Sequence, residues 1–285
     1  MQHHHFTLPG GQRLHYTAWG KPGAQAVVCV HGLTRNARDF DFLAQQLSDD
    51  FYVLCLDVLG RGESSWASEP EEYTLHTYAQ QALAWLDGLN LSKPHWVGTS
   101  MGGLIALTLQ MIAPQRFGQL VLNDVGPVIE MAALKRIAHY IGAAPSFDNR
   151  ELAVAYAKTI FTGFGAKTPQ QWAGLTDFYY VDDETGGVSM HYDPVIAQVT
   201  RLQVAGMSDQ VIAASEAALW ASLKSIAQPV LVLRGAQSDL LSPATVTAMC
   251  AANPLLKAIE ISDCGHAPHL MDTAQAQLIH TFLKS

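Results

Sequence analysis

The chain has 285 residues, of which 49% are hydrophobic, so it is long enough for one large domain or two smaller ones. Lys and Arg number 17 against 25 Asp and Glu, which gives a formal net charge of −8 without any block of like charges. This balance argues against the extended cationic surface that a nucleic acid or an anionic membrane requires of a partner. We therefore expect a compact globular protein whose partner is a small molecule.

The N-terminal segment, residues 1–10, has no apolar run of the length that a secretory signal requires. It contains three consecutive histidines at residues 3–5, which we interpret as incidental in a mobile terminus, with no metal bound.

The four cysteines are widely spaced and lack C-x-x-C pairs, which is typical of neither a disulfide framework nor a zinc site. We expect a cytoplasmic location. The cysteines are Cys29, Cys55, Cys250 and Cys264.

Short apolar runs alternate with helical patterns through the first half of the chain and again near its end. Continuous apolar runs suit parallel strands that are buried on both faces. Alternation of strands and helices predicts an open, mostly parallel sheet with helices on both faces. Strands are predicted at 14–19, 27–30, 52–58, 96–97, 120–122, 230–233 and 258–261, and helices near 39–47, 73–89 and 101–112.

The alternation lapses between the strands at 120–122 and 230–233, where helical patterns appear at 131–141 and 152–161. We predict that residues 127–222 form a helical cap, inserted into an α/β core made of residues 1–126 and 223–285. This segment holds 11 of the chain's 25 aromatic residues. Most should pack the cap itself, and a few should face a ligand and set selectivity, with Trp172 and Tyr180 as examples.

The motif G-x-S-x-G occurs at residues 98–102, between an apolar strand and an apolar helix. In this context the serine lies on a tight strand-to-helix turn that exposes its hydroxyl, and the glycines allow the backbone to pass closely. The helix that begins at Met101 directs free N–H groups toward negative charge near Ser100. The motif therefore predicts Ser100 as a nucleophile.

A serine nucleophile requires a general base and an orienting carboxylate. His266 follows the predicted strand at 258–261, and Asp239 follows the predicted strand at 230–233. Because ligands bind at the carboxyl ends of strands in an open α/β sheet, we predict the triad Ser100, Asp239 and His266. His269 is interpreted as structural.

An oxyanion hole requires two backbone N–H groups directed at the developing negative charge. Met101 directly follows the nucleophile and is predicted to supply the first. The second is predicted to come from Leu33, because His31-Gly32-Leu33 follows the strand at 27–30 and the glycine permits close approach.

These motifs make the chain resemble the α/β-hydrolase superfamily over essentially its whole length, which implies an eight-stranded sheet. The resemblance implies architectural roles for Asp57 and Arg61, and the serine at position 100 disfavours epoxide opening and halide displacement. Some relatives take the triad acid from the strand before the cap, where Asp124 stands, so Asp124 is the alternative to Asp239. The matching stretches are His31-Gly32, residues 57–64 (DVLGRGES), residues 98–103 (GTSMGG), Asp239 and Gly265-His266.

Residues 33–40 and 122–127 are similar to small bacterial capped hydrolases described as carboxylesterases or lactonases. We predict a serine hydrolase that cleaves carboxylic esters of small, apolar or aromatic substrates through an acyl-enzyme, without a cofactor or metal. Two alternatives stay open: hydrolysis of a lactone or a carbon-carbon bond in ring-cleavage products, and a non-enzymatic ligand receptor. The protein is expected to be a monomer or homodimer.

Overall fold

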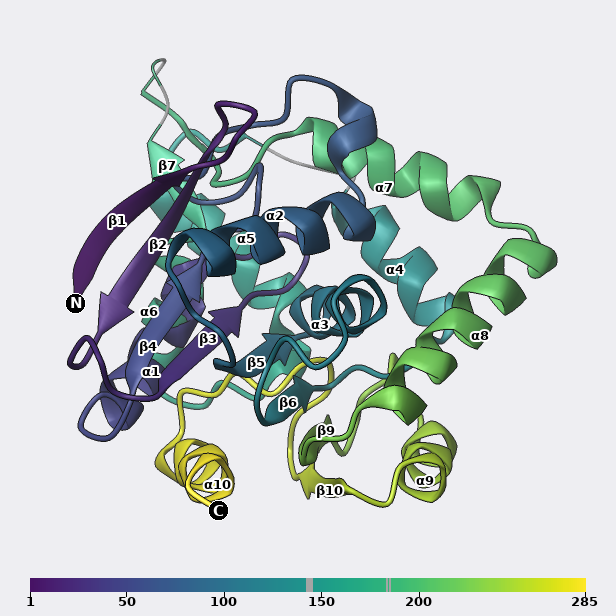
Figure 1. Cartoon of the computed structure of the whole chain (residues 1–285). Helices are drawn as coiled ribbons and strands as arrows, with labels where there is room; N and C mark the ends of the chain where they lie inside the picture. The colour runs from purple at the N-terminus through teal and green to yellow at the C-terminus, as the bar shows by residue number, and fades with distance from the viewer. Residues whose placement is uncertain (142–145, 183, 185) are drawn as a thin grey trace.

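A computed structural model describes residues 1–285 except 142–145, 183 and 185. Eight strands form one sheet in the order β1-β2-β4-β3-β5-β6-β9-β10, with β2 antiparallel to both β1 and β4 and the pairings from β4 to β10 parallel (Figure 1). The predicted mostly parallel eight-stranded sheet is therefore confirmed. The strands are β1 (Gln2–Thr7), β2 (Arg13–Trp19), β3 (Ala26–Val30), β4 (Tyr52–Leu56), β5 (His95–Thr99), β6 (Leu120–Asn123), β9 (Val230–Gly235) and β10 (Leu256–Ile261).

The central strands are buried on both faces, as β3 illustrates. Val27 and Cys29 belong to one apolar cluster with residues of α1 and α10, while Val28 and Val30 belong to another with residues of α2 and α3. Successive side chains of a strand point to opposite faces, so a strand between two helical layers must be apolar throughout. The helices are α1 (Asp41–Leu47), α2 (Leu75–Gly88), α3 (Met101–Ile112), α9 (Pro243–Ala252) and α10 (Thr273–Leu283), with short 3₁₀ helices η1 (Ala37–Phe40) and η2 (Pro70–Glu72).

The three N-terminal histidines lie in an ordered strand, which corrects the prediction of a mobile terminus. Strand β1 pairs antiparallel with β2 and places His5 opposite His15. The ring of His3 stacks on that of His15 with centroids 5.1 Å apart. The strand was not predicted because its residues are mostly polar. An edge strand held by backbone hydrogen bonds and ring stacking needs no apolar pattern.

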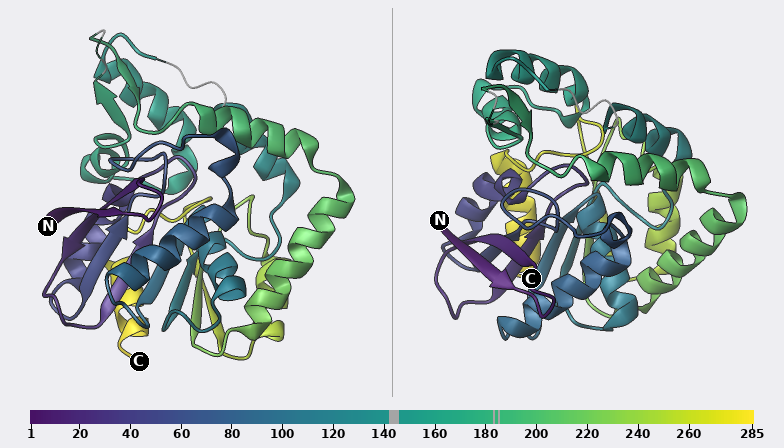
Figure 2. Two further views of the ribbon diagram at one scale, coloured as in Figure 1. Left: turned by 45° about the horizontal axis from the view of Figure 1, so that its top comes forward. Right: turned by 90° about the horizontal axis from the view of Figure 1, so that it is seen from above.

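The segment between β6 and β9, here called the insert (residues 127–222), is mainly helical, as expected. It also contains a two-stranded antiparallel sheet that the sequence did not predict. Figure 2 shows the insert lying beyond one end of the strands, with α8 running back alongside the sheet. The division into core and cap stays a prediction. The elements are α4 (Met131–Ile141), α5 (Arg150–Ile160), η3 (Thr162–Phe164), α6 (Pro169–Thr176), β7 (Tyr180–Asp182), β8 (Val188–Met190), α7 (Val195–Gly206) and α8 (Asp209–Ser225).

Helix α3 lies within a stretch without charged residues, residues 94–115, that approaches the length of a membrane span. Among the described residues, no helix is long and apolar enough to cross a membrane. The apolar character of α3 has a different cause, since ten of its twelve residues are buried against the sheet and neighbouring helices.

Candidate active site

Ser100 lies at the sharp turn between β5 and α3, with backbone angles φ 50° and ψ −114°. A non-glycine residue rarely adopts a positive φ, and such strain is found at functional turns. The turn requires its glycines: a Cβ at Gly98 would lie 2.4 Å from the carbonyl carbon of Gly102, and one at Gly102 would lie 2.0 Å from the Val30 oxygen. The sequence therefore folds here into a nucleophile elbow that presents the Ser100 hydroxyl.

His266 lies in the loop after β10, and its Nε2 is 2.9 Å from the Ser100 hydroxyl oxygen. Its imidazole is 9% exposed, so the ring is shielded from solvent while it contacts the serine. The structure thus brings together two residues that are 166 positions apart in the sequence. A neutral imidazole that accepts at Nε2 and donates at Nδ1 fits a general base.

The carboxylate beside His266 belongs to Asp124, and the predicted placement of Asp239 there is wrong. Asp124 follows β6, is fully buried, and has its Oδ2 2.7 Å from His266 Nδ1. Asp239 points away and forms an ion pair with Arg136 at 2.8 Å, with both side chains about half exposed. The polar side chain of that loop that reaches Asp124 is Ser238, not Asp239.

Asp124 is held by two donors, one at the end of β9 and one in the loop that follows it. The backbone N–H of Gly235 donates to Oδ1 at 2.8 Å, and the Ser238 hydroxyl donates to Oδ2 at 2.6 Å. Charge-assisted bonds of this kind fix an ionised carboxylate and lower its desolvation cost. No sequence pattern pointed to Ser238 as a partner of the carboxylate, because this contact depends on how the loop turns.

The loop after β3 is fixed by His31, which is fully buried. Its Nδ1 donates to the Gly32 carbonyl at 2.7 Å, and its Nε2 accepts the Val58 N–H at 3.0 Å. Burial lowers the pKa of His31 to about 4, so the ring is neutral near pH 7, as these two bonds require. His31 therefore sets the position of Leu33, the predicted second oxyanion residue.

His269 also lies near the site, and its contacts fit the predicted structural role. Its Nδ1 accepts the Met271 N–H at 2.9 Å, and burial lowers the pKa of the ring. This contact does not involve the Ser100 hydroxyl. No group of three or more His, Cys, Asp or Glu side chains is arranged to hold a metal ion in the part of the chain that the structure describes.

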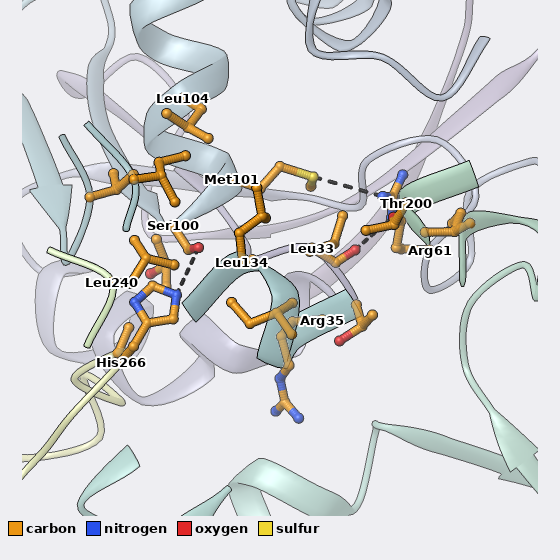
Figure 3. A pocket seen from close by; sticks show the side chains of 18 of the residues that line it. Leu33, Arg35, Arg61, Ser100, Met101, Leu104, Leu134, Thr200, Leu240 and His266 are labelled. Carbon is orange, nitrogen blue, oxygen red and sulfur yellow. Dashed lines mark hydrogen bonds between the residues drawn. The ribbon is translucent and has the colours of Figure 1, made fainter. Parts of the chain in front are cut away.

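Ser100 and His266 open into a cavity of about 360 Å³ that is lined by both the sheet edge and the insert (Figure 3). This volume lies within the range of ligand pockets, and most of the side chains that line it are apolar. Leu33 and Met101 both line it beside the serine. The apolar and aromatic lining includes Leu104, Val125, Ile129, Leu134, Ile137, Tyr140, Phe161, Phe164, Leu175, Ile196, Val199, Val204, Met207 and Leu240.

The insert contributes three aromatic rings to this cavity, those of Tyr140, Phe161 and Phe164. Trp172 and Tyr180, the two examples chosen from the sequence, are not among its lining residues. The Tyr180 ring packs on Tyr179 at a centroid distance of 4.9 Å, within the aromatic core of the insert. Composition predicted aromatic lining but could not select the rings.

Arg35 joins the core to the insert at one wall of the cavity. Its guanidinium pairs with Asp39 and donates to the Leu175 carbonyl at 2.8 Å. It also lies 4.8 Å from the centroids of the Phe161 and Tyr179 rings, which allows cation–π attraction from both. The position of the aromatic wall therefore depends on a charged residue of the core.

Comparisons with known proteins agree with this geometry. Residues 27–278 match the model of the alpha/beta hydrolase family. A 3-hydroxybutyrate-oligomer hydrolase of Cupriavidus necator is 41% identical over 96% of this chain and 93% of its own, and a 3-oxoadipate enol-lactonase of Acinetobacter baylyi is 25% identical over 83% and 80%. The crystal structure of a putative hydrolase from Rickettsia typhi superposes with a TM-score of 0.90 at 30% identity, covering 100% of this chain and 99% of that one. The chain belongs to the alpha/beta hydrolase family.

Proposed function

We propose that this protein is a serine hydrolase that cleaves carboxylic esters through an acyl-enzyme intermediate. The observation that carries the proposal is the chain of contacts from buried Asp124 through His266 to Ser100, at 2.7 Å and 2.9 Å, beside an apolar cavity. A carboxylate, an imidazole and a hydroxyl in this order are the parts of a serine-hydrolase triad.

In the proposed reaction, His266 removes the proton of Ser100 as the hydroxyl oxygen attacks the ester carbonyl. The backbone N–H groups of Leu33 and Met101 stabilise the oxyanion, and His266 then protonates the departing alcohol. Water, deprotonated by the same imidazole, attacks the acyl-enzyme and releases the acid and Ser100. Asp124 holds the imidazole tautomer and stabilises the imidazolium in both halves of the reaction.

For the substrate we propose short oligoesters of small hydroxy acids, with 3-hydroxybutyrate oligomers as the first to test. Support comes from the relative named as a hydrolase of such oligomers, whose similarity extends over nearly both chains. The cavity fits this class, because its lining is largely apolar and its volume suits a small aliphatic ester.

A lactone is the second candidate substrate, favoured by the similarity to an enol-lactonase. A lactone is a cyclic ester, so the same nucleophile, base and oxyanion groups would open it. The two candidates differ in the fate of the alcohol, which stays attached to the acyl group when a ring is opened.

The test compares purified protein on the 3-hydroxybutyrate dimer and trimer, on p-nitrophenyl butyrate and on an enol-lactone. We expect hydrolysis of the oligomers and of the p-nitrophenyl ester, and stoichiometric labelling of Ser100 by a fluorophosphonate. Ser100→Ala is the control for both readouts. Absence of labelling together with absence of turnover on every ester would overturn the proposed function, and turnover of the lactone alone would move it to the second candidate.

A further inference from the structure

Arg61 carries a buried positive charge beside the catalytic cavity. It follows β4 within the stretch predicted to be architectural, and it is 0% exposed. Its Nη1 donates to the Leu59 carbonyl at 2.7 Å and to the Tyr78 hydroxyl at 2.8 Å. Its guanidinium also lies 4.9 Å from the centroid of the Tyr78 ring. In the described residues it forms no ion pair, so neutral groups alone solvate this charge.

The other two buried arginines each pair with a carboxylate, unlike Arg61. Arg35 pairs with Asp39, and Arg234 pairs with Glu260 at 2.7 Å. Burying an ion without a partner costs several kcal/mol even after relaxation, so it is disfavoured on grounds of stability alone. An uncompensated guanidinium next to a catalytic cavity therefore calls for a reason other than stability.

The remaining contacts of Arg61 reach both residues proposed to form the oxyanion hole. Its Nε donates to the Leu33 carbonyl at 2.9 Å, and its Nη2 lies 3.7 Å from the Met101 sulfur. Figure 3 shows Arg61 across the pocket from His266, with Leu33 and Met101 between it and Ser100. These two residues come from different elements, the loop after β3 and the start of α3. One planar side chain thus contacts both.

We propose that Arg61 is a positioning residue that fixes the spacing of the Leu33 and Met101 backbones and places a buried positive charge behind the oxyanion hole. This inference rests on the proposed function. A rigid guanidinium can hold several acceptors in fixed directions, which a lysine cannot. Its charge also acts through a low-dielectric interior, where attraction to a developing oxyanion is much stronger than in water. Arg61 is among the residues that line the cavity, but its side chain is 0% exposed, so the role assigned to it acts through Leu33 and Met101 and not through direct contact with the substrate.

The test uses Arg61→Met and Arg61→Lys, with rates expressed per serine labelled by the fluorophosphonate at completion. For Arg61→Met we expect kcat to fall by about 10²-fold, the lower end of the loss on removing an oxyanion donor, while KM changes by less than about twofold. Arg61→Lys keeps the charge but cannot reach all the acceptors, so an intermediate loss is expected.

Affinity for an alkyl boronic acid, which forms a tetrahedral adduct with the serine, distinguishes positioning from a merely structural role. In Arg61→Met it should weaken by the same factor as kcat/KM, because both report on the oxyanion site. A structural defect lowers the active fraction, and normalisation to labelled serine removes that effect. An unchanged boronic acid affinity per active site would overturn the inference.

Arg116→Met is the matched control. Arg116 also binds backbone carbonyls, those of Leu91 and Ser92, and pairs with Asp87, but it does not line the cavity. Its loss should leave kcat and boronic acid affinity unchanged. If Arg61→Met does not fold, the test rests on Arg61→Lys. A kcat and a boronic acid affinity of Arg61→Lys equal to those of the wild type would then overturn the inference. If the wild type itself hydrolyses no ester, the proposed function fails instead.

Discussion

The carboxyl edge of the sheet and the insert build the same cavity in different ways. At the edge, Ser100, Asp124 and His266 each lie a few residues beyond a strand, and short hydrogen bonds join them. The insert contributes rings such as Phe161 and Phe164, held by packing and by Arg35 from the core. The comparison indicates that strand geometry places the three side chains of the proposed triad, while long-range packing shapes the cavity beside them. The two regions should therefore respond differently to substitution.

The largest effect is expected at the edge, from Ser100→Ala. Removal of the proposed nucleophile should lower kcat on any ester by about 10⁶-fold and abolish fluorophosphonate labelling. The thermal midpoint should stay within a few degrees of the wild type, because the change removes one oxygen at a partly exposed turn. An ester rate close to that of the wild type would show that the elbow does not carry the chemistry.

The two aspartates give the next largest effect and test the edge from within. Asp124→Asn should lower kcat by about 10⁴-fold, because an amide cannot stabilise the imidazolium and favours the wrong tautomer. Asp239→Asn is the matched control and should change kcat by less than about threefold, since it removes only an exposed ion pair with Arg136. The measurement is steady-state hydrolysis of one ester by both variants. The opposite ranking would contradict the geometry of the site.

The two aspartates also show how far a sequence can predict such a site. Strand-turn-helix context predicted Ser100, the position after the last strand predicted His266, and the structure places these two side chains in contact. Asp124 and Asp239 follow neighbouring strands, and what separates them is side-chain direction. Asp124 has φ 56° and turns toward His266, whereas the loop after β9 turns Ser238 inward instead. Such directions depend on contacts more than 100 residues apart, which periodicity and motif spacing do not record.

The same dependence on composition and periodicity explains which strands could be predicted from the sequence and which could not. Continuous apolar runs predicted the buried strands β3, β4, β5, β6 and β9, because burial on both faces requires apolar side chains throughout a strand. Strand β1 shows no such run, since its pairing uses backbone groups and its side chains, apart from Phe6, are polar and largely exposed. The strands β7 and β8 of the insert are three residues each, too short to show an alternating pattern.

Acid should lower the free energy of unfolding through His31 at the sheet edge, whereas the buried tyrosines of the insert should not respond to it. Burial lowers the pKa of His31 to about 4, below the ordinary value of 6.5, so the unfolded chain binds this proton more readily than the native protein. The stability that neutral His31 contributes is complete above about pH 6.5 and is lost as the pH falls toward 4, by about 3 kcal/mol in total. Burial raises the pKa of Tyr140 and Tyr180, which are neutral throughout this range.

Urea unfolding at several pH values between 4 and 7 measures this contribution. The free energy of unfolding of the wild type should decrease toward pH 4, and the decrease should be shallower in His31→Asn. His269→Asn is the comparison variant, because the pKa of that ring is also lowered but the ring does not hold the loop after β3. Equal pH slopes for the wild type and His31→Asn would show that His31 does not couple protonation to folding.

The smallest effect is expected in the insert, and it concerns selectivity instead of rate. Phe164 lines the cavity, whereas Trp172 does not, although both are partly buried rings of the same segment. Phe164→Ala enlarges the space next to the acyl or alcohol group, so it should change the ratio of kcat/KM between p-nitrophenyl acetate and p-nitrophenyl octanoate by about tenfold. Trp172→Ala removes a ring that only supports the insert, so it should lower stability while leaving this ratio within about twofold. Because the ratio compares two substrates on one preparation, it is independent of the active fraction. If Phe164→Ala lowers both kcat/KM values equally, the insert supports the cavity without selecting the substrate. If Trp172→Ala changes the ratio as much as Phe164→Ala does, substrate selection depends on the packing of the insert as a whole.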